Sequence, residues 1–169
     1  MVNANFDQKL DWAKAESFYD FHALDIDGND VSMEKYRGYL TIVVNIATKC
    51  GLAKKHYKQF ASLHEKYKDL KIIGFPTIKP STPENGQQLK DVLVNKFDVK
   101  FDIMDKIEVN GDDAHPIYKW LKSFKLYEND DININFFKYL IGKDGKIIKL
   151  FEPMIYPDDM EPELVEYLK

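Results

Sequence analysis

The sequence predicts an α/β fold in which helices cover both faces of a mixed β-sheet, and three observations carry that prediction. Residues 39–47, YLTIVVNIA, form a nearly continuous apolar run rich in β-branched side chains, typical of a central strand. Residues 51–67 place apolar side chains at helical spacing, and residues 70–76, LKIIGFP, form a second strand. A strand–helix–strand unit of this kind implies a parallel strand pair with a right-handed crossover.

The elements on either side of this unit extend the sheet and cover it. Hairpins are expected around Asp27-Gly28-Asn29 and around Asp144-Gly145. Residues 77–86, TIKPSTPENG, are expected to form a loop because they are rich in proline and small polar residues. Helices are expected over residues 87–97, 112–124 and 157–169, and residues 101–111 are expected to be extended or irregular. The result is a mixed central sheet with helices on both faces and an N-terminal β-hairpin, as in thioredoxin-like folds.

Length and composition indicate one soluble domain. The chain has 169 residues, of which 44% are hydrophobic, enough for one sizeable core. We expect residues 1–14 to be an N-terminal lead-in and residues 15–169 to be the single domain. The net charge of −4 argues against a nucleic-acid partner. The single cysteine fits a reducing compartment, and no secretory signal or membrane-spanning stretch is evident, so we expect a cytoplasmic protein.

The only cysteine, Cys50, is expected at the junction between the first long strand and the following helix. Unpaired N–H groups and the helix dipole favour a negative charge there, and Lys49, Lys54 and His56 are expected to favour the thiolate further. Gly51 leaves the approach to the sulfur unobstructed. On position alone a reactive thiolate and an inert core cysteine remain equally good interpretations.

Two other features have ordinary explanations beside functional ones. The stretch DIDGND, residues 25–30, is better explained as a hairpin turn than as a calcium loop, and the histidines show no metal-ligand spacing. Three lysines next to Cys50 either recognise anionic thiols or lipid headgroups or form a solvated helix face: Lys54, Lys55 and Lys58.

The stretches DIDGNDVSMEKYRG and VVNIATKCG resemble the opening of the glutathione peroxidase family, which has a K-Y-R-G hairpin followed by N-V-A-S-x-(Sec/Cys)-G. The similarity continues through IIGFP, VKFDIMDKIEVNGDDAHPIYKWLK and INFFKYLIGKDGKIIKLFEPM, so it covers the chain from Asp11 to its end. It is greatest to the phospholipid hydroperoxide branch, whose members are mostly monomers. That branch lacks the subunit-contact loop of the tetrameric enzymes, and the corresponding segment of this chain, residues 122–136, is likewise short. The resemblance therefore implies a monomer.

The resemblance implies an antioxidant oxidoreductase with a thiol peroxidase mechanism. Catalytic Cys50, which aligns with selenocysteine in many members, would reduce hydrogen peroxide or lipid hydroperoxides, including those of membranes. Glutathione or another external thiol would regenerate it as co-substrate, with no bound cofactor and no metal. A resolving cysteine is absent, because Cys50 is the only cysteine and the third residue after it is Ala53.

The resemblance also implies a second catalytic residue and two losses. Asn135 matches the asparagine of the family's W-N-F-T-K-F motif and could donate an amide hydrogen bond at the sulfur. The tryptophan position before it is Ile134, and no glutamine of the 77–86 loop aligns with the family's active-site glutamine. Candidate auxiliary residues are Gly51, Lys49 and, if the next helix is shifted, Gln87. The losses keep an alternative open: a catalytically impaired homologue that serves as a redox-sensitive binding or structural protein.

Overall fold

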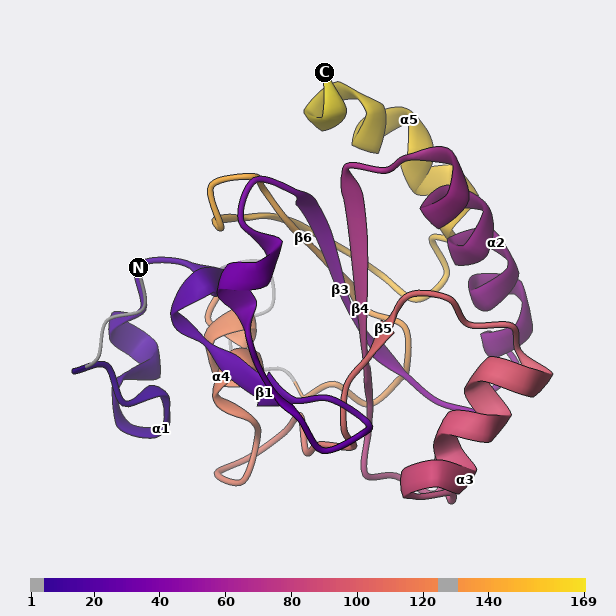
Figure 1. Cartoon of the computed structure of the whole chain (residues 1–169), viewed down its shortest axis with the longest axis horizontal. Helices are drawn as coiled ribbons and strands as arrows, with labels where there is room; N and C mark the ends of the chain where they lie inside the picture. Colours follow the sequence, from indigo (N-terminus) through magenta and orange to yellow (C-terminus); the bar gives the residue numbers. More distant parts are fainter. Residues whose placement is uncertain (1–4, 125–130) are drawn as a thin grey trace.

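The computed structural model describes residues 5–124 and 131–169, and its centre is a five-stranded sheet in the order β5-β4-β3-β6-β7 (Figure 1). Strand β3 pairs with β4 in parallel and with β6 antiparallel, so the predicted mixed sheet is confirmed. Strand β5 is parallel to β4, and β7 is antiparallel to β6. The strands are β3 (Leu40–Ile46), β4 (Leu70–Pro76), β5 (Asp102–Ile103), β6 (Lys138–Ile141) and β7 (Ile147–Phe151).

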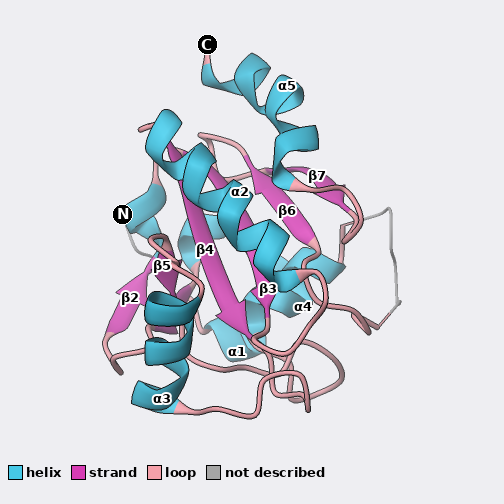
Figure 2. Cartoon of the chain, turned by 90° about the vertical axis from the view of Figure 1, so that its right-hand side faces the viewer, coloured by secondary structure: helices cyan, strands magenta, loops and turns pink. Residues whose placement is uncertain are grey.

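Helices cover both faces of this sheet, as predicted. Helices α2, α3 and α5 lie on one face, and Figure 2 shows α2 in front of β3 and β4. The other face carries α4 and the hairpin of β1 and β2, which Figure 1 shows on the opposite side from α2. The bounds are α1 (Gln8–Asp11), β1 (His22–Leu24), β2 (Asp30–Ser32), α2 (Ala53–Lys66), α3 (Gly86–Asp91), α4 (Pro116–Lys122) and α5 (Pro157–Leu168).

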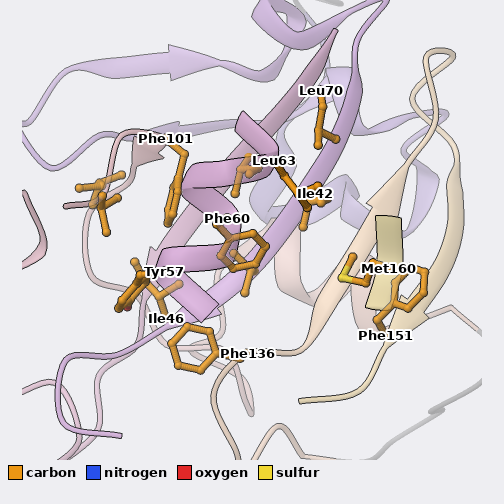
Figure 3. Close-up of a cluster of buried hydrophobic side chains, with 14 of the residues drawn as sticks. Ile42, Ile46, Tyr57, Phe60, Leu63, Leu70, Phe101, Phe136, Phe151 and Met160 are labelled. Carbon is orange, nitrogen blue, oxygen red and sulfur yellow. The ribbon is translucent and has the colours of Figure 1, made fainter. Parts of the chain in front are cut away.

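Strand β3 is buried on both faces, as its continuous apolar run predicts. Because side chains alternate along a strand, Ile42 and Ile46 point toward α2 while Val43 joins the cluster on the opposite face. Figure 3 shows Ile42 and Ile46 beside Phe60 of α2. The first of these clusters fixes α2 over the sheet, and with it the turn that enters α2.

The bounds of α3 and α4 differ from the expected ones, and for α4 the reason is local. Helix α4 begins only at Pro116, because the side chain of His115 accepts the N–H of Ile117 (3.1 Å) and caps the helix there. Helix α3 starts at Gly86 and continues as a π-helical turn over Val92–Lys96. The 77–86 loop is confirmed as a loop up to that helix start.

The described part of the lead-in, residues 5–14, docks on the hairpin. Phe6 contacts Phe21 edge-on, with ring centroids 5.9 Å apart, and the side chain of Gln8 accepts the N–H of His22 (2.9 Å). The division between residues 1–14 and 15–169 stays a prediction. Within residues 5–124 and 131–169, no helix has the length and apolar character needed to cross a bilayer.

Gly74 in the middle of β4 leaves no room for a side chain. A Cβ atom there would lie 2.6 Å from Cε2 of Phe101 and 2.9 Å from Cδ1 of Ile46. We expect Gly74→Ala to lower the free energy of unfolding by about 1–3 kcal/mol, measured by urea denaturation, because a packed core resists an added methyl group. Gly51→Ala is the matched control, since nothing lies within 4 Å of a Cβ there. Equal stability of the two variants would contradict this account.

Candidate active site

Cys50 lies in the turn between β3 and α2, at the sheet edge where the parallel strands β3 and β4 both end. Its side chain is partly exposed and packs against the cluster beneath α2. The carbonyl of Cys50 accepts the N–H of Ala53 (3.0 Å), and the hydroxyl of Tyr57 donates to the carbonyl of Ala47 (2.5 Å). No residue that the structure describes forms a hydrogen bond with the sulfur.

The 77–86 loop closes against this turn through Ser81. The carbonyl of Ser81 accepts two backbone N–H groups, those of Thr48 (3.2 Å) and Lys49 (2.8 Å). The hydroxyl of Thr48 also donates to the carboxylate of Glu84 (2.6 Å). The ammonium of Lys106 holds the far end of the loop by donating to the carbonyl of Glu84 (3.0 Å). The loop therefore fixes the residues that precede Cys50.

The segment that carries Asn135 is bound to β3 by one buried side chain. Asn45 Nδ2 donates to the carbonyl of Ile134 (3.1 Å), and Asn45 Oδ1 accepts the N–H of Phe137 (2.9 Å). The backbone carbonyl of Asn45 accepts the N–H of Phe136 (2.7 Å). Phe136 has a φ of 71°, in the left-handed region that non-glycine residues avoid. Asn45 thus holds the backbone on both sides of Asn135.

Asn135 is almost fully buried at 6% exposure, and its amide is held at both ends. Its Nδ2 donates to Oγ of Ser81 (3.2 Å), and its Oδ1 accepts from Oγ1 of Thr77 (3.3 Å). Ser81 therefore contacts both the residues before Cys50 and the side chain of Asn135. Ser81 thus links the backbone directly before Cys50 to the side chain of Asn135, the two residues that the sequence predicts to be catalytic.

His56 does not supply the positive charge that the sequence led us to expect beside Cys50. It is fully buried, and burial together with the charge of Lys138 lowers the pKa of His56 to about 3. Its Nδ1 donates to the carbonyl of Leu52 (2.8 Å), and its Nε2 lies 2.9 Å from Nζ of Lys138. The prediction of a cationic His56 is wrong, because sequence proximity to Cys50 gives no information on burial.

The candidate auxiliary residues differ in their surroundings. Lys49 is exposed and adjoins Cys50, and Gly51 has open space where a side chain would be. Gln87 is exposed on α3, where its amide donates to Asp91 of the same helix (2.7 Å), so it gains no support as a site residue. Ile134, next to Asn135, is 53% exposed and has no polar group to offer.

The lysines after Cys50 form an exposed surface. Lys54, Lys55 and Lys58 are all exposed, and Lys55 Nζ lies 4.2 Å from the centre of the Tyr156 ring, a cation–π contact.

The stretch DIDGND, residues 25–30, forms the predicted hairpin turn. The side chain of Asp25 accepts the backbone N–H groups of Asp27 and Asn29 (both 2.9 Å) within this turn. The described residues contain no group of three or more metal-ligating side chains.

Sequence reasoning missed the polar residues that organise the site: Asn45, Thr77, Ser81 and the pair His56–Lys138. One signal was present for two of them. Asn45 interrupts the apolar run IVVNIA and Lys138 interrupts FFKYLI, and a polar residue inside a buried strand needs a partner. Thr77 and Ser81 gave no such signal, since threonine and serine are ordinary loop residues.

These features define a class: a thioredoxin-like protein with one partly exposed cysteine at the strand-to-helix turn and no second cysteine for an internal disulfide. Structures of low identity support the fold alone. One is a thiol:disulfide interchange protein of the thioredoxin family from Chlorobium tepidum, with a TM-score of 0.64 and 16% identity, covering 88% of this chain and 93% of that chain.

More similar proteins identify the family. The glutathione peroxidase family model matches residues 18–122. A pig phospholipid hydroperoxide glutathione peroxidase (Sus scrofa) is 40% identical over 165 residues, covering 94% of this chain and 83% of that protein. A probable phospholipid hydroperoxide glutathione peroxidase from Nicotiana sylvestris is 37% identical, covering 92% and 95%. The crystal structure of T. cruzi GPX1 superposes with a TM-score of 0.74 at 28% identity, covering 90% and 97%. The chain belongs to the glutathione peroxidase family and is a peroxidase.

The buried ammonium of Lys138 generates a pH dependence of stability. Burial lowers the pKa of Lys138 to about 7, whereas the unfolded chain keeps a value near 10.5. Between these values the unfolded chain binds a proton that the folded chain lacks, so stability rises with pH. We expect the free energy of unfolding to rise by about 2 kcal/mol from pH 7 to pH 9, measured by urea denaturation.

Two variants isolate this contribution. Lys138→Met should flatten the rise between pH 7 and pH 9, because the titrating group is gone. Lys143→Met, which changes an exposed lysine of the β6–β7 turn, should leave the rise intact. A Lys138→Met protein with an unchanged pH profile would show that this lysine keeps an ordinary pKa in the folded chain.

Proposed function

We propose that Cys50 is the residue at which this peroxidase reduces hydroperoxides, with Asn135 as the polar group that assists it. The observation that carries the proposal is a partly exposed Cys50 in the turn that Ser81 joins to the Asn135 amide. We propose further that lipid hydroperoxides are among the substrates, because the similar proteins are described as phospholipid hydroperoxide glutathione peroxidases. The exposed lysines of α2 next to Cys50 suit an anionic headgroup or glutathione.

The chemistry needs one sulfur and two external thiols. The Cys50 thiolate attacks one oxygen of the peroxide, the O–O bond breaks, and the leaving oxygen takes a proton and departs as alcohol or water. Sulfur is thereby oxidised to sulfenic acid. A first glutathione, or another thiol, releases water and forms a mixed disulfide, and a second releases oxidised glutathione and restores the thiol. Because Cys50 is the only cysteine, the chain supplies neither reducing thiol.

Asn135 is proposed to stabilise the charge that develops on the leaving oxygen. An amide bears two N–H donors, and the contact with Ser81 uses one of them. No described residue accepts the remaining N–H, and we propose that it serves the reaction. A cytoplasmic location and a monomeric state remain proposals: the first from the single unpaired cysteine, the second from the short 122–136 segment. Residues 125–130 of that segment lie outside the described part of the chain.

The alternative, an impaired homologue that acts as a redox-sensitive binding or structural protein, is not favoured. Its motive was the absence of the family's tryptophan and glutamine, represented here by Ile134 and by a 77–86 loop without glutamine. The loop nevertheless closes on the Cys50 turn, and its Ser81 contacts Asn135. A polar site therefore persists without those two side chains.

Cys50→Ser should abolish peroxide reduction. Wild-type protein should lose its single titratable thiol on near-stoichiometric hydrogen peroxide at pH 7 and should turn over with glutathione, followed by coupled oxidation of NADPH. A phospholipid hydroperoxide in detergent micelles, compared with hydrogen peroxide by kcat/KM, tests the lipid proposal. Folded wild-type protein whose thiol survives peroxide would refute the proposed function, and equal turnover by Cys50→Ser would refute the role of Cys50.

Asn135→Ala should lower the rate of Cys50 oxidation by roughly 10²-fold, because a fixed donor at a developing charge is lost. Stopped-flow measurement of thiol loss at several peroxide concentrations gives this rate constant directly. Asn133→Ala is the matched control, since it removes the same amide from an exposed position two residues away. If both variants oxidise at the wild-type rate, Asn135 has no part in the chemistry.

A further inference from the structure

Lys138 is a buried lysine whose partners are all uncharged. It lies at the start of β6 with an exposure of 0%. Its Nζ donates to the carbonyls of Glu152 (3.0 Å) and Pro153 (3.3 Å) and lies 2.9 Å from Nε2 of His56. No carboxylate of the described residues forms an ion pair with it. A buried lysine that is not paired for charge needs another explanation.

The explanation begins with the tautomer of His56. The carbonyl of Leu52 can only accept, so the contact at Nδ1 requires the proton to be on Nδ1. In a neutral ring the other nitrogen, Nε2, then accepts, and Lys138 is the donor that it meets. Both nitrogens are therefore occupied, and the ring is fully buried. His56 cannot touch a substrate, but its orientation is fixed from two sides.

Each side of this imidazole supports one half of the proposed site. Leu52, whose carbonyl accepts the hydrogen bond from Nδ1, is the N-cap of α2 and stands two residues after Cys50. The ring stacks on Phe136 with centroids 4.4 Å apart and an interplanar angle of 14°. Phe136 follows Asn135 directly and has the strained φ of 71°. Figure 3 shows the Phe136 ring near the Tyr57 end of α2, at the entry to the helix.

We propose that His56, oriented by Lys138, is a positioning residue that holds the turn carrying Cys50 in register with the segment carrying Asn135. The proposal rests on the proposed function, in which these two residues act together on the peroxide. The side chain of His56 contacts both segments. A misplacement of about 1 Å between reacting groups can cost ~10²-fold in rate. The Tyr156 ring also packs against the imidazole, with the two ring centroids 4.6 Å apart.

Three variants test the proposal. His56→Phe keeps an aromatic ring for the stack but loses both hydrogen bonds, and Lys138→Met removes the donor that orients His56. His115→Phe is the control, because it replaces a half-buried histidine, the cap of α4 on the opposite face of the sheet. We expect the first two variants to lower the rate constant of Cys50 oxidation by hydrogen peroxide at least roughly 10-fold. The control should oxidise within about twofold of wild type.

Coupling to Asn135 separates positioning from a general loss of stability. In an Asn135→Ala background, His56→Phe should cost clearly less than in the wild-type background, because one of the two groups it aligns is already gone. All rates are measured on protein shown by circular dichroism to be folded at the assay temperature. If His56→Phe fails to fold, His56→Gln and Lys138→Met decide by the same measurements.

Hydrogen exchange gives a readout that is independent of activity. The N–H groups of Ala53 and Phe136 should both exchange at least about 10-fold faster in His56→Phe, and in His115→Phe neither should change. Unchanged exchange and unchanged coupling in folded His56→Phe and Lys138→Met would overturn the proposal. If wild-type protein fails to reduce peroxide, the proposed function fails, and exchange alone still decides whether His56 holds the two segments together.

Discussion

The site depends on the way one side chain, that of Asn45, continues the strand pairing where β3 and β6 cease to pair. The regular ladder between these strands ends at Val44 and Lys138. Asn45 then uses its amide and its carbonyl to bind the backbone of residues 134–137. A buried backbone group without a partner costs about 1–3 kcal/mol of stability. Because the Asn45 amide takes the place of a strand partner, the chain leaves the sheet without that cost. The departure from the sheet places Asn135 beside Ser81.

The strained backbone of Phe136 is a consequence of the same constraint. A left-handed conformation costs a non-glycine residue of order 1–3 kcal/mol and persists only where neighbours enforce it. Here the N–H of Phe136 is held by the carbonyl of Asn45, and its ring is stacked on His56. Strain, stacking and hydrogen bonding thus converge on the residue that follows Asn135. Together these constraints on Phe136 fix the direction of the Asn135 side-chain amide.

The fold was predictable because it follows from patterns that are local in sequence. The continuous run 39–47 specified a strand buried on both faces, and Asp144-Gly145 specified the late hairpin. For the candidate site, the sequence indicated the place of Cys50 between strand and helix, and the family resemblance pointed to Asn135; their catalytic roles stay predictions. The contacts of Ser81 with Thr48 and Asn135 join segments 33 and 54 residues apart, and no spacing rule predicts such pairs. His56 illustrates the converse error, since nearness to Cys50 along the chain suggested a charge that burial removes.

The three acceptors around Lys138 explain why an ammonium is tolerated there. An ammonium has three donors, and the two carbonyls and His56 Nε2 take one each, so none is left unpaired. A neutral amine keeps only two N–H bonds and turns a lone pair toward an acceptor, so one of the three contacts must weaken when the proton leaves. Because the His56 ring is already fixed by Leu52 and by Phe136, its Nε2 cannot turn away to accommodate this loss. The protonation state of one buried lysine is therefore coupled, through a single imidazole, to the two segments that make the site.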